Sequence, residues 1–134
     1  EHNGNLLALI RLVKYWNNRR ITHTIGSYML ECMILERYEN MITPEKWWID
    51  LQFRDTLNHL SSAIYYSVND PKGIQGDMNT FSYSEKVKIS EALKNAYDKA
   101  SEATTLETSN KDQKSAIKKW GEVLGDYFPK YTGV

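Results

Sequence analysis

Two short segments of the sequence carry side chains that could do chemistry together. The first contains Lys14, which lies four residues after Ile10 and seven after Leu7, in a stretch whose apolar residues recur at helical spacing. Its ammonium therefore falls at the edge of the apolar arc of that helix rather than on the solvated face. A lysine whose aliphatic stem covers the core while its ammonium reaches water would explain this position without any ligand.

The second segment is Gly26-Ser27-Tyr28, which opens a strongly apolar stretch. We expect Ser27 to cap a helix here, and the N–H groups of a first helical turn favour an anion, as does the helix dipole. An ordinary cap followed by a buried tyrosine is the simpler alternative. Taken together with Lys14, the segment predicts a phosphate held between a cation and a helix start, with the Tyr28 ring placed to stack on a base.

Other reactive groups are sparse. No two acidic residues are separated by a single position, which is the simplest way for a strand to present two carboxylates to one metal ion. The histidines His2, His23 and His59 lie far apart in the sequence. We therefore expect neither a metal site nor a catalytic residue in this chain alone. Cys32 lies in the most apolar stretch, where an inert buried thiol is expected; a hydrolase that pairs Cys32 with His23 or His59 ranks lowest among the alternatives.

The elements that must position these residues are helices. Apolar residues recur at helical spacing along most of the chain, and no long stretch alternates as a strand would, which predicts an all-α bundle of about five helices. Capping residues or a proline open each segment. The expected helices extend from Leu6 (with Asn5 as N-cap) to Arg20, from Tyr28 to Tyr38 as the central helix, from Pro44 (after Thr43 as cap) to Tyr66, from the Ser82/Glu85 capping box to Ala103, and from the Asn110/Gln113 capping pair to Leu124 before Gly125.

One Pro/Gly-rich loop separates the third and fourth expected helices. Asn69 to Asp77 contains Pro71, Gly73 and Gly76 together with several Asx residues, a composition that turns the chain. We interpret it as a structural turn, with the alternative that it faces a ligand or a partner.

Charge and cysteine content restrict the partners. The 17 Lys and Arg residues balance the 17 Asp and Glu residues, so we expect no broad surface for nucleic acid and no anionic membrane partner. The longest stretch without a charge runs from Thr56 to Asn69 and is too short and too polar to cross a bilayer. A single cysteine and the lack of a signal-peptide pattern favour a cytoplasmic location.

Four motifs occur in an order found in a known family. They are LIRLVKYWN at 9–17, GSYMLE at 26–31, NDPKG at 69–73, and AIKKW at 116–120 followed by YFP at 127–129. Over nearly its whole length the chain thereby resembles the C-terminal helical half of the oligoadenylate-synthase-like and cGAS/DncV-like nucleotidyltransferases. The bacterial members of that family make cyclic oligonucleotides in antiphage defence.

The resemblance implies a fold, a ligand and roles for three residues. Residues 1–134 would form a single helical domain, the C-terminal lobe of a longer enzyme, and the start at Glu1 rather than Met is compatible with this. The substrate would be ATP or GTP, and the N-terminal catalytic lobe, absent here, would bind Mg²⁺. The family's phosphate-contacting lysine matches Lys14, its small polar phosphate contact matches Ser27, and its base-stacking tyrosine matches Tyr28.

A stand-alone protein-interaction module is the alternative function. Trp47 and Trp48 are adjacent, and two neighbouring side chains cannot both point inward from one helix. Either one of them is exposed or lies at an interface, or both are buried on two sides of a central helix, and the sequence alone favours neither.

Overall fold

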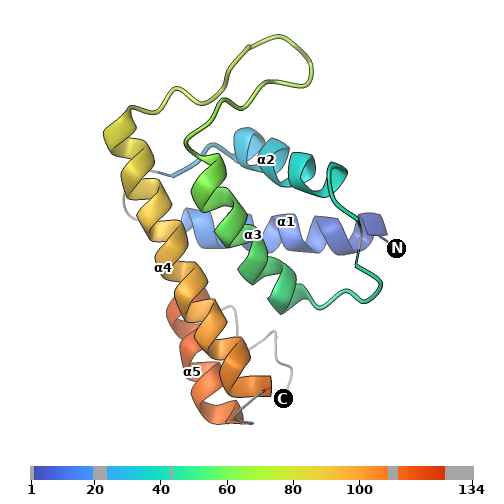
Figure 1. Ribbon diagram of the computed structural model, residues 1–134, viewed down its shortest axis with the longest axis vertical. Helices are drawn as coiled ribbons and strands as arrows, with labels where there is room; N and C mark the ends of the chain where they lie inside the picture. Colours follow the sequence, from blue (N-terminus) through green and yellow to red (C-terminus); the bar gives the residue numbers. More distant parts are fainter. Residues whose placement is uncertain (1, 20–23, 43, 109–111, 126–134) are drawn as a thin grey trace.

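The computed structural model describes residues 2–19, 24–42, 44–108 and 112–125, and its regular elements are helices (Figure 1). Five helices occur in these ranges, and the only β-type pairing among them is an isolated bridge between Asn69 and Asp77. The helices are α1 (His2–Asn18), α2 (Ser27–Glu39), α3 (Ile49–Ala63), α4 (Tyr83–Thr108) and α5 (Gln113–Leu124). The predicted all-α bundle of about five helices with one Pro/Gly-rich loop is confirmed.

Helix α3 occupies the centre of the bundle. It packs against α1, α2 and α4, whereas α2 packs only against α1 and α3 among the described helices. The long helix α4 runs beside α3 and then continues beside α5 (Figure 1). The prediction that α2 is the central helix is wrong, because α2 lies at the edge of the bundle and leaves Tyr28 and Leu35 more than a third exposed.

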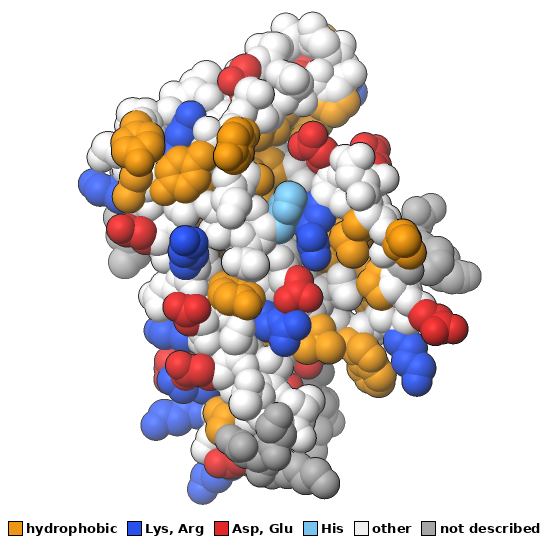
Figure 2. Space-filling view, viewed as in Figure 1, with side chains coloured by type: hydrophobic (Ala, Val, Ile, Leu, Met, Phe, Trp, Pro, Cys, Tyr) orange, Lys and Arg blue, Asp and Glu red, His pale blue; other side chains and the backbone are white. Residues whose placement is uncertain are grey.

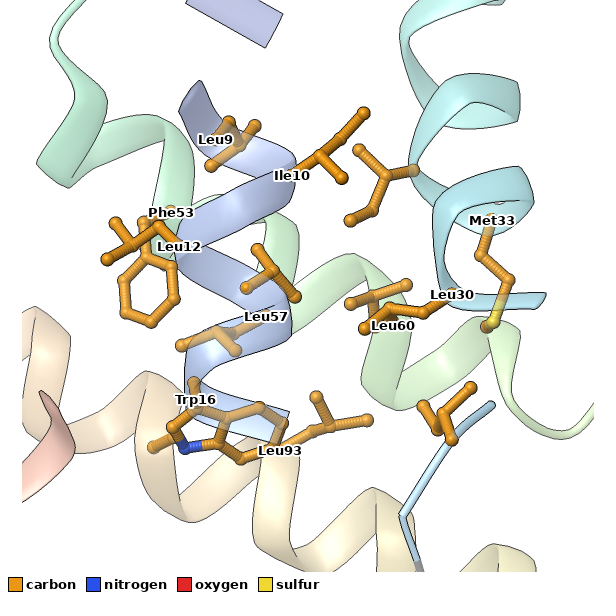
Figure 3. Close-up of a cluster of buried hydrophobic side chains, with 14 of the residues drawn as sticks. Leu9, Ile10, Leu12, Trp16, Leu30, Met33, Phe53, Leu57, Leu60 and Leu93 are labelled. Carbon is orange, nitrogen blue, oxygen red and sulfur yellow. The ribbon is translucent and has the colours of Figure 1, made fainter. Parts of the chain in front are cut away.

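Apolar side chains from all five helices meet in one core, part of which is drawn in Figure 3. Helices α1, α2, α3 and α4 each contribute buried side chains from successive turns. Full burial of each such side chain contributes about 1.5–3 kcal/mol relative to exposure. The labelled members of this core are Leu9, Ile10, Leu12, Trp16, Leu30, Met33, Phe53, Leu57, Leu60 and Leu93. Trp120 of α5 extends it, with its ring centroid 6.3 Å from that of Phe53.

The N-termini of the first three helices differ from the sequence expectations. Helix α1 begins at His2, so Asn5 lies inside it and is not its cap. Gly26, not Ser27, is the N-cap of α2. Trp48 is the N-cap of α3, which places Pro44 before that helix. Thr43, the expected cap of this third helix, lies outside the described residues.

The predicted start of α4 and the predicted end of α5 are confirmed, whereas α4 extends to Thr108, beyond its predicted end at Ala103. The Ser82 N–H donates to the Glu85 carboxylate at 2.8 Å and the Glu85 N–H donates to the Ser82 hydroxyl at 3.2 Å, which is a reciprocal capping box. Helix α5 ends at Leu124, and its C-cap Gly125 has a φ of 62°, which favours glycine. The N-cap of α5 is Asp112 rather than Asn110, which lies outside the described residues.

A buried side chain fixes the entry into α2. Asn17, at the end of α1, is 2% exposed. Its Nδ2 donates to the Ile25 carbonyl at 2.7 Å, and its Oδ1 accepts the Ile25 N–H at 3.1 Å. One carboxamide thus pairs both backbone groups of Ile25, just before α2 begins.

The segment between α3 and α4 is tied down in the same way. The Asn79 Nδ2 donates to the carbonyls of Ile64 and Tyr66, both at 2.7 Å, at the C-terminal end of α3. Asp77 accepts the N–H groups of Val68 and Asn79, both at 2.9 Å. The two segments that flank the loop beginning at Asn69 are therefore hydrogen-bonded to each other where the loop leaves the bundle and returns to it.

None of the helices in the described part of the chain has both the length and the apolar character needed to cross a bilayer.

Replacing Asn17 by Ala should lower the free energy of unfolding by about 1–3 kcal/mol, because the two backbone groups of Ile25 would be left buried without partners. Urea unfolding at pH 7 measures the change. Asn18→Ala is the matched control, since Asn18 is exposed on the same turn, and it should alter stability by less than about 0.5 kcal/mol. Equal stability of the two variants would contradict the role assigned to Asn17.

Candidate functional site

An open recess of about 390 Å³ lies between the start of α2 and the loop that precedes α4. Its two walls come from segments far apart in the sequence. It combines hydroxyl and carboxamide groups with an aromatic ring and apolar side chains, a mixture typical of sites for small ligands. The residues that line it are Gly26, Ser27, Tyr28, Met29, Gln75, Met78, Thr80 and Phe81.

Ser27 is exposed at the first turn of α2. The prediction that Ser27 caps this helix is wrong, because the helix already includes Ser27 and its N-cap is Gly26. Glycine has no side-chain acceptor, and the N-terminus of α2 carries no side-chain cap hydrogen bond. No side-chain cap therefore competes for the first-turn N–H groups of α2, and such groups in general favour an anion.

Tyr28 lies beside Ser27 on the recess wall. Its side chain is 37% exposed, which differs from the fully buried tyrosine of the simpler alternative. The hydroxyl donates a hydrogen bond to Asp70 Oδ1 at 2.9 Å. The ring is thus anchored at its polar end and retains accessible surface.

Asp70 is a buried carboxylate that organises the loop opposite α2. It is 6% exposed. In addition to the Tyr28 hydroxyl, Oδ1 accepts the N–H of Lys72 at 3.0 Å, and Oδ2 accepts the N–H groups of Ile74 at 3.2 Å and Gln75 at 3.1 Å. A single carboxylate therefore joins the start of α2 to the middle of the loop.

These hydrogen bonds shift the pKa values of both partners. The N–H of Lys72, the Tyr28 hydroxyl and the other loop amides hold the pKa of Asp70 below its ordinary value, although burial opposes the shift. The bond to Asp70, helped by burial, raises the pKa of Tyr28 to about 12. At neutral pH the pair consists of an ionised carboxylate and a protonated phenol.

Lys14 pairs with a carboxylate on α2. Its Nζ lies 3.1 Å from Glu31 Oε2, and both side chains are about one third exposed, at 30% and 37%. Glu31 is four residues after Ser27 and so lies on the same face of α2, one turn away. The ammonium reaches that face from α1, as expected of a lysine at the edge of an apolar arc, but Lys14 does not line the recess.

The structure thus brings two of the three predicted residues together. Ser27 and Tyr28 share the recess, and Lys14 is held one helical turn along α2 by Glu31. The sequence analysis missed Asp70 and Gln75. The available signal was the Asn-Asp-Pro-Lys-Gly run, which marks a turn but does not reveal that the loop faces α2.

Two further sequence candidates have separate environments. Burial raises the pKa of the Cys32 thiol, which favours its unreactive protonated form. Burial also lowers the pKa of His59, which lies on α3. No hydrogen bond joins Cys32 to His59 in the described part of the chain, and His23 lies outside it. The structure gives no support to a cysteine hydrolase.

The adjacent residues Trp47 and Trp48 differ in their exposure to solvent. Trp47 packs against the core, and its ring centroid lies 5.6 Å from that of Tyr38. Trp48 is 58% exposed. Of the arrangements left open by the sequence, the one with a single exposed tryptophan is confirmed.

A second hollow lies between α2 and α3 and has a volume of about 510 Å³. Its walls include Arg37 and His59 together with Met33 and Tyr66. Figure 2 shows a histidine side chain beside a basic side chain on the face in view. The hollow contains none of the predicted ligand-binding residues.

Acidification should release the loop through Asp70. The folded pKa lies below the ordinary value of 3.8, so the carboxylate stabilises the loop above about pH 3.8, and this stabilisation is lost as the pH falls through the lower folded value. Amide NMR of Ile74 and Gln75 from pH 7 to pH 2 should show both resonances shifting with a common midpoint below 3.8. Asp70→Asn should lack this transition; a midpoint at or above the ordinary value would contradict the bonding described.

Comparison with known proteins supplies an independent finding. No family model matches the chain. Over 133 residues, or 98% of its length, the chain is 37% identical to a protein of Bacillus cereus (strain VD146) named probable cyclic nucleotide synthase. The match covers 38% of that relative, so the chain spans well under half of its length. This chain is therefore similar to one region of a longer protein that is named as a cyclic nucleotide synthase.

Proposed function

We propose that the chain is the nucleotide-binding helical lobe of a nucleotidyltransferase that makes cyclic oligonucleotides from ATP or GTP. The observation that carries the proposal is the recess in which two features lie side by side: the start of α2, which has no side-chain cap hydrogen bond, and the partly exposed Tyr28. The sequence motifs and the identity to the Bacillus relative support the reaction class.

The role of this chain would be binding and orientation. The first turn of α2 and the Ser27 hydroxyl would hold a phosphate group, and the Tyr28 ring would stack on the base. Lys14 would add a cation for the outer phosphates of the same nucleotide. Holding a donor in one geometry removes much of the entropic barrier to its reaction with an acceptor.

Mg²⁺, which the resemblance implies, does not fit the residues at hand. No group of three or more His, Cys, Asp or Glu side chains could hold a metal ion within the described residues. Asp70, which bonds to Tyr28 and Gln75 of the recess lining, already accepts hydrogen bonds at both oxygens. The resemblance assigns Mg²⁺ to the N-terminal catalytic lobe of the longer enzyme.

A protein-interaction module at Trp47 and Trp48 has less support. Only Trp48 is substantially exposed, so the two rings do not form one surface. A role in antiphage defence and a cytoplasmic location follow from the resemblance alone and remain expectations.

Nucleotide binding should depend on the proposed contacts. In isothermal titration with ATP and GTP, Lys14→Ala should weaken binding about tenfold to a hundredfold, the value of a hydrogen bond to a charged group. Tyr28→Ala should weaken it about five-fold or more through lost stacking. Lys88→Ala and Tyr83→Ala, at exposed positions of α4, are the matched controls.

The same variants test the function in the complete protein. Lys14→Ala and Tyr28→Ala should reduce both nucleotide affinity and product formation there, while the two control variants should reduce neither. Unchanged affinity and unchanged product formation in both site variants would overturn the assignment.

Glu31 should restrain Lys14 in the unliganded chain. Because the pair is partly exposed, its net contribution is on the order of 0.2–1 kcal/mol. Glu31→Gln should therefore tighten the binding of inorganic tripolyphosphate up to about five-fold, the affinity equivalent of that range, with little change in stability. Glu39→Gln, at an exposed position of the same helix, is the control. Weaker binding by Glu31→Gln would show that the ion pair supports the site instead of competing with it.

A further inference from the structure

The loop from Asn69 to Asp77 faces the recess, although the sequence favoured a purely structural turn. We propose that this loop is the second wall of a base subsite, in which Gln75 contacts the edge of an adenine base and Asp70 acts as a positioning residue. The inference rests on the proposed function and deepens it by naming the base and the residue that selects it.

The recess provides a ring and a carboxamide in one space. Tyr28 contributes a partly exposed aromatic ring from α2, and Gln75 contributes an exposed polar side chain from the loop. Met78 adds apolar surface on the loop side. A flat, polar-edged molecule such as a nucleobase matches this combination, because its face can pack on the ring while its edge meets hydrogen-bonding groups.

Asp70 holds the Tyr28 ring and the backbone of Gln75 in a fixed relation. Its Oδ1 accepts the Tyr28 hydroxyl at 2.9 Å, and its Oδ2 accepts the Gln75 N–H at 3.1 Å. The two walls of the recess therefore share one carboxylate. Movement of the loop away from α2 would break a charge-assisted hydrogen bond to the ring.

The remainder of the loop restricts other movements. Two backbone hydrogen bonds join its ends. The Met78 N–H donates to the Val68 carbonyl at 2.8 Å, and the Asp70 N–H donates to the Gly76 carbonyl at 2.9 Å. Gly76, next to Gln75, has a φ of 69°, a conformation that other residues rarely adopt. Gln75 is thus presented from a tightly hydrogen-bonded turn.

A carboxamide distinguishes adenine from guanine. Adenine presents the N6 amino donor beside the N7 acceptor, and glutamine can pair with both at once. Guanine presents two acceptors, O6 and N7, at the same edge, so the carboxamide oxygen has no donor there. Gln75 therefore favours ATP over GTP.

The test compares three probes on the 134-residue chain: ATP, GTP and inorganic tripolyphosphate. Gln75→Ala should lower ATP affinity about two- to ten-fold, as expected for neutral hydrogen bonds, and leave tripolyphosphate affinity unchanged. Gln75→Glu should weaken ATP binding at least as much as Gln75→Ala and should not favour GTP, because a carboxylate cannot donate to N7 and finds only acceptors at the guanine edge. Ile74→Ala is the matched control, since Ile74 is the neighbouring exposed residue and lies outside the recess lining.

The positioning role of Asp70 has its own readout. Asp70→Asn should reduce ATP affinity but not tripolyphosphate affinity. Tyr28→Phe, which keeps the ring and removes the hydroxyl, should cause a smaller loss in the same direction. If Asp70→Asn fails to fold, Tyr28→Phe alone decides, and an unchanged ratio of ATP to tripolyphosphate affinity in that variant would overturn the positioning role.

The possible failures are distinct. If the unmodified chain binds neither ATP nor tripolyphosphate, both the proposed function and this inference fail. If tripolyphosphate binds in a manner that requires Lys14 but Gln75→Ala and Gln75→Glu leave the ATP and GTP affinities as they are in Ile74→Ala, the inference about the base subsite is wrong and the proposed function stands.

Discussion

The candidate site depends on the hydrogen bonds that the buried Asp70 carboxylate accepts. A buried carboxylate destabilises a fold unless hydrogen bonds replace its hydration. Here three loop amides and the Tyr28 hydroxyl supply those bonds. The loop and the start of α2 are consequently parts of one hydrogen-bonded unit, and the recess between them has defined walls.

The helical bundle holds that unit at both ends. Asn17 pairs with Ile25 and fixes where the chain enters α2. Asn79 pairs with the carbonyls of Ile64 and Tyr66, just after α3, and fixes where the loop returns. Both carboxamides are buried and bond to backbone groups that would otherwise lack partners. Because these two bonded segments flank the recess, the packing of the bundle also determines where the recess lies. Lys14 belongs to the same arrangement, because its partner Glu31 lies one turn beyond Ser27 on α2.

Helical periodicity was sufficient to predict the fold class, and local capping chemistry identified the boundary at α4. The Ser82/Glu85 box succeeded because both of its hydrogen bonds are local in sequence. Ser27 was misassigned as a cap because tertiary bonds through Asn17 position the preceding segment and let the helix start at Ser27. The position of α2 was also wrong, since an apolar run does not reveal which of its faces the bundle leaves exposed.

The difference between local and long-range contacts also explains which residues of the candidate site could be predicted from the sequence. Ser27 and Tyr28 were identifiable because a helix start and an aromatic residue are adjacent in sequence. Asp70 and Gln75 were not, because their relation to Tyr28 spans more than forty residues and arises only when the loop folds back over α2. The ion pair between Lys14 and Glu31 likewise joins two helices and has no local signature.

The central claim is that the recess between α2 and the loop binds a nucleotide. Titration of ATP into the isotopically labelled chain, followed by amide NMR, tests it most directly. The account predicts saturable shifts concentrated at Ser27, Tyr28 and Gln75, with little change at Arg37 and His59, which line the hollow between α2 and α3. Saturable shifts confined to Arg37 and His59, or the lack of any saturable shift, would contradict it.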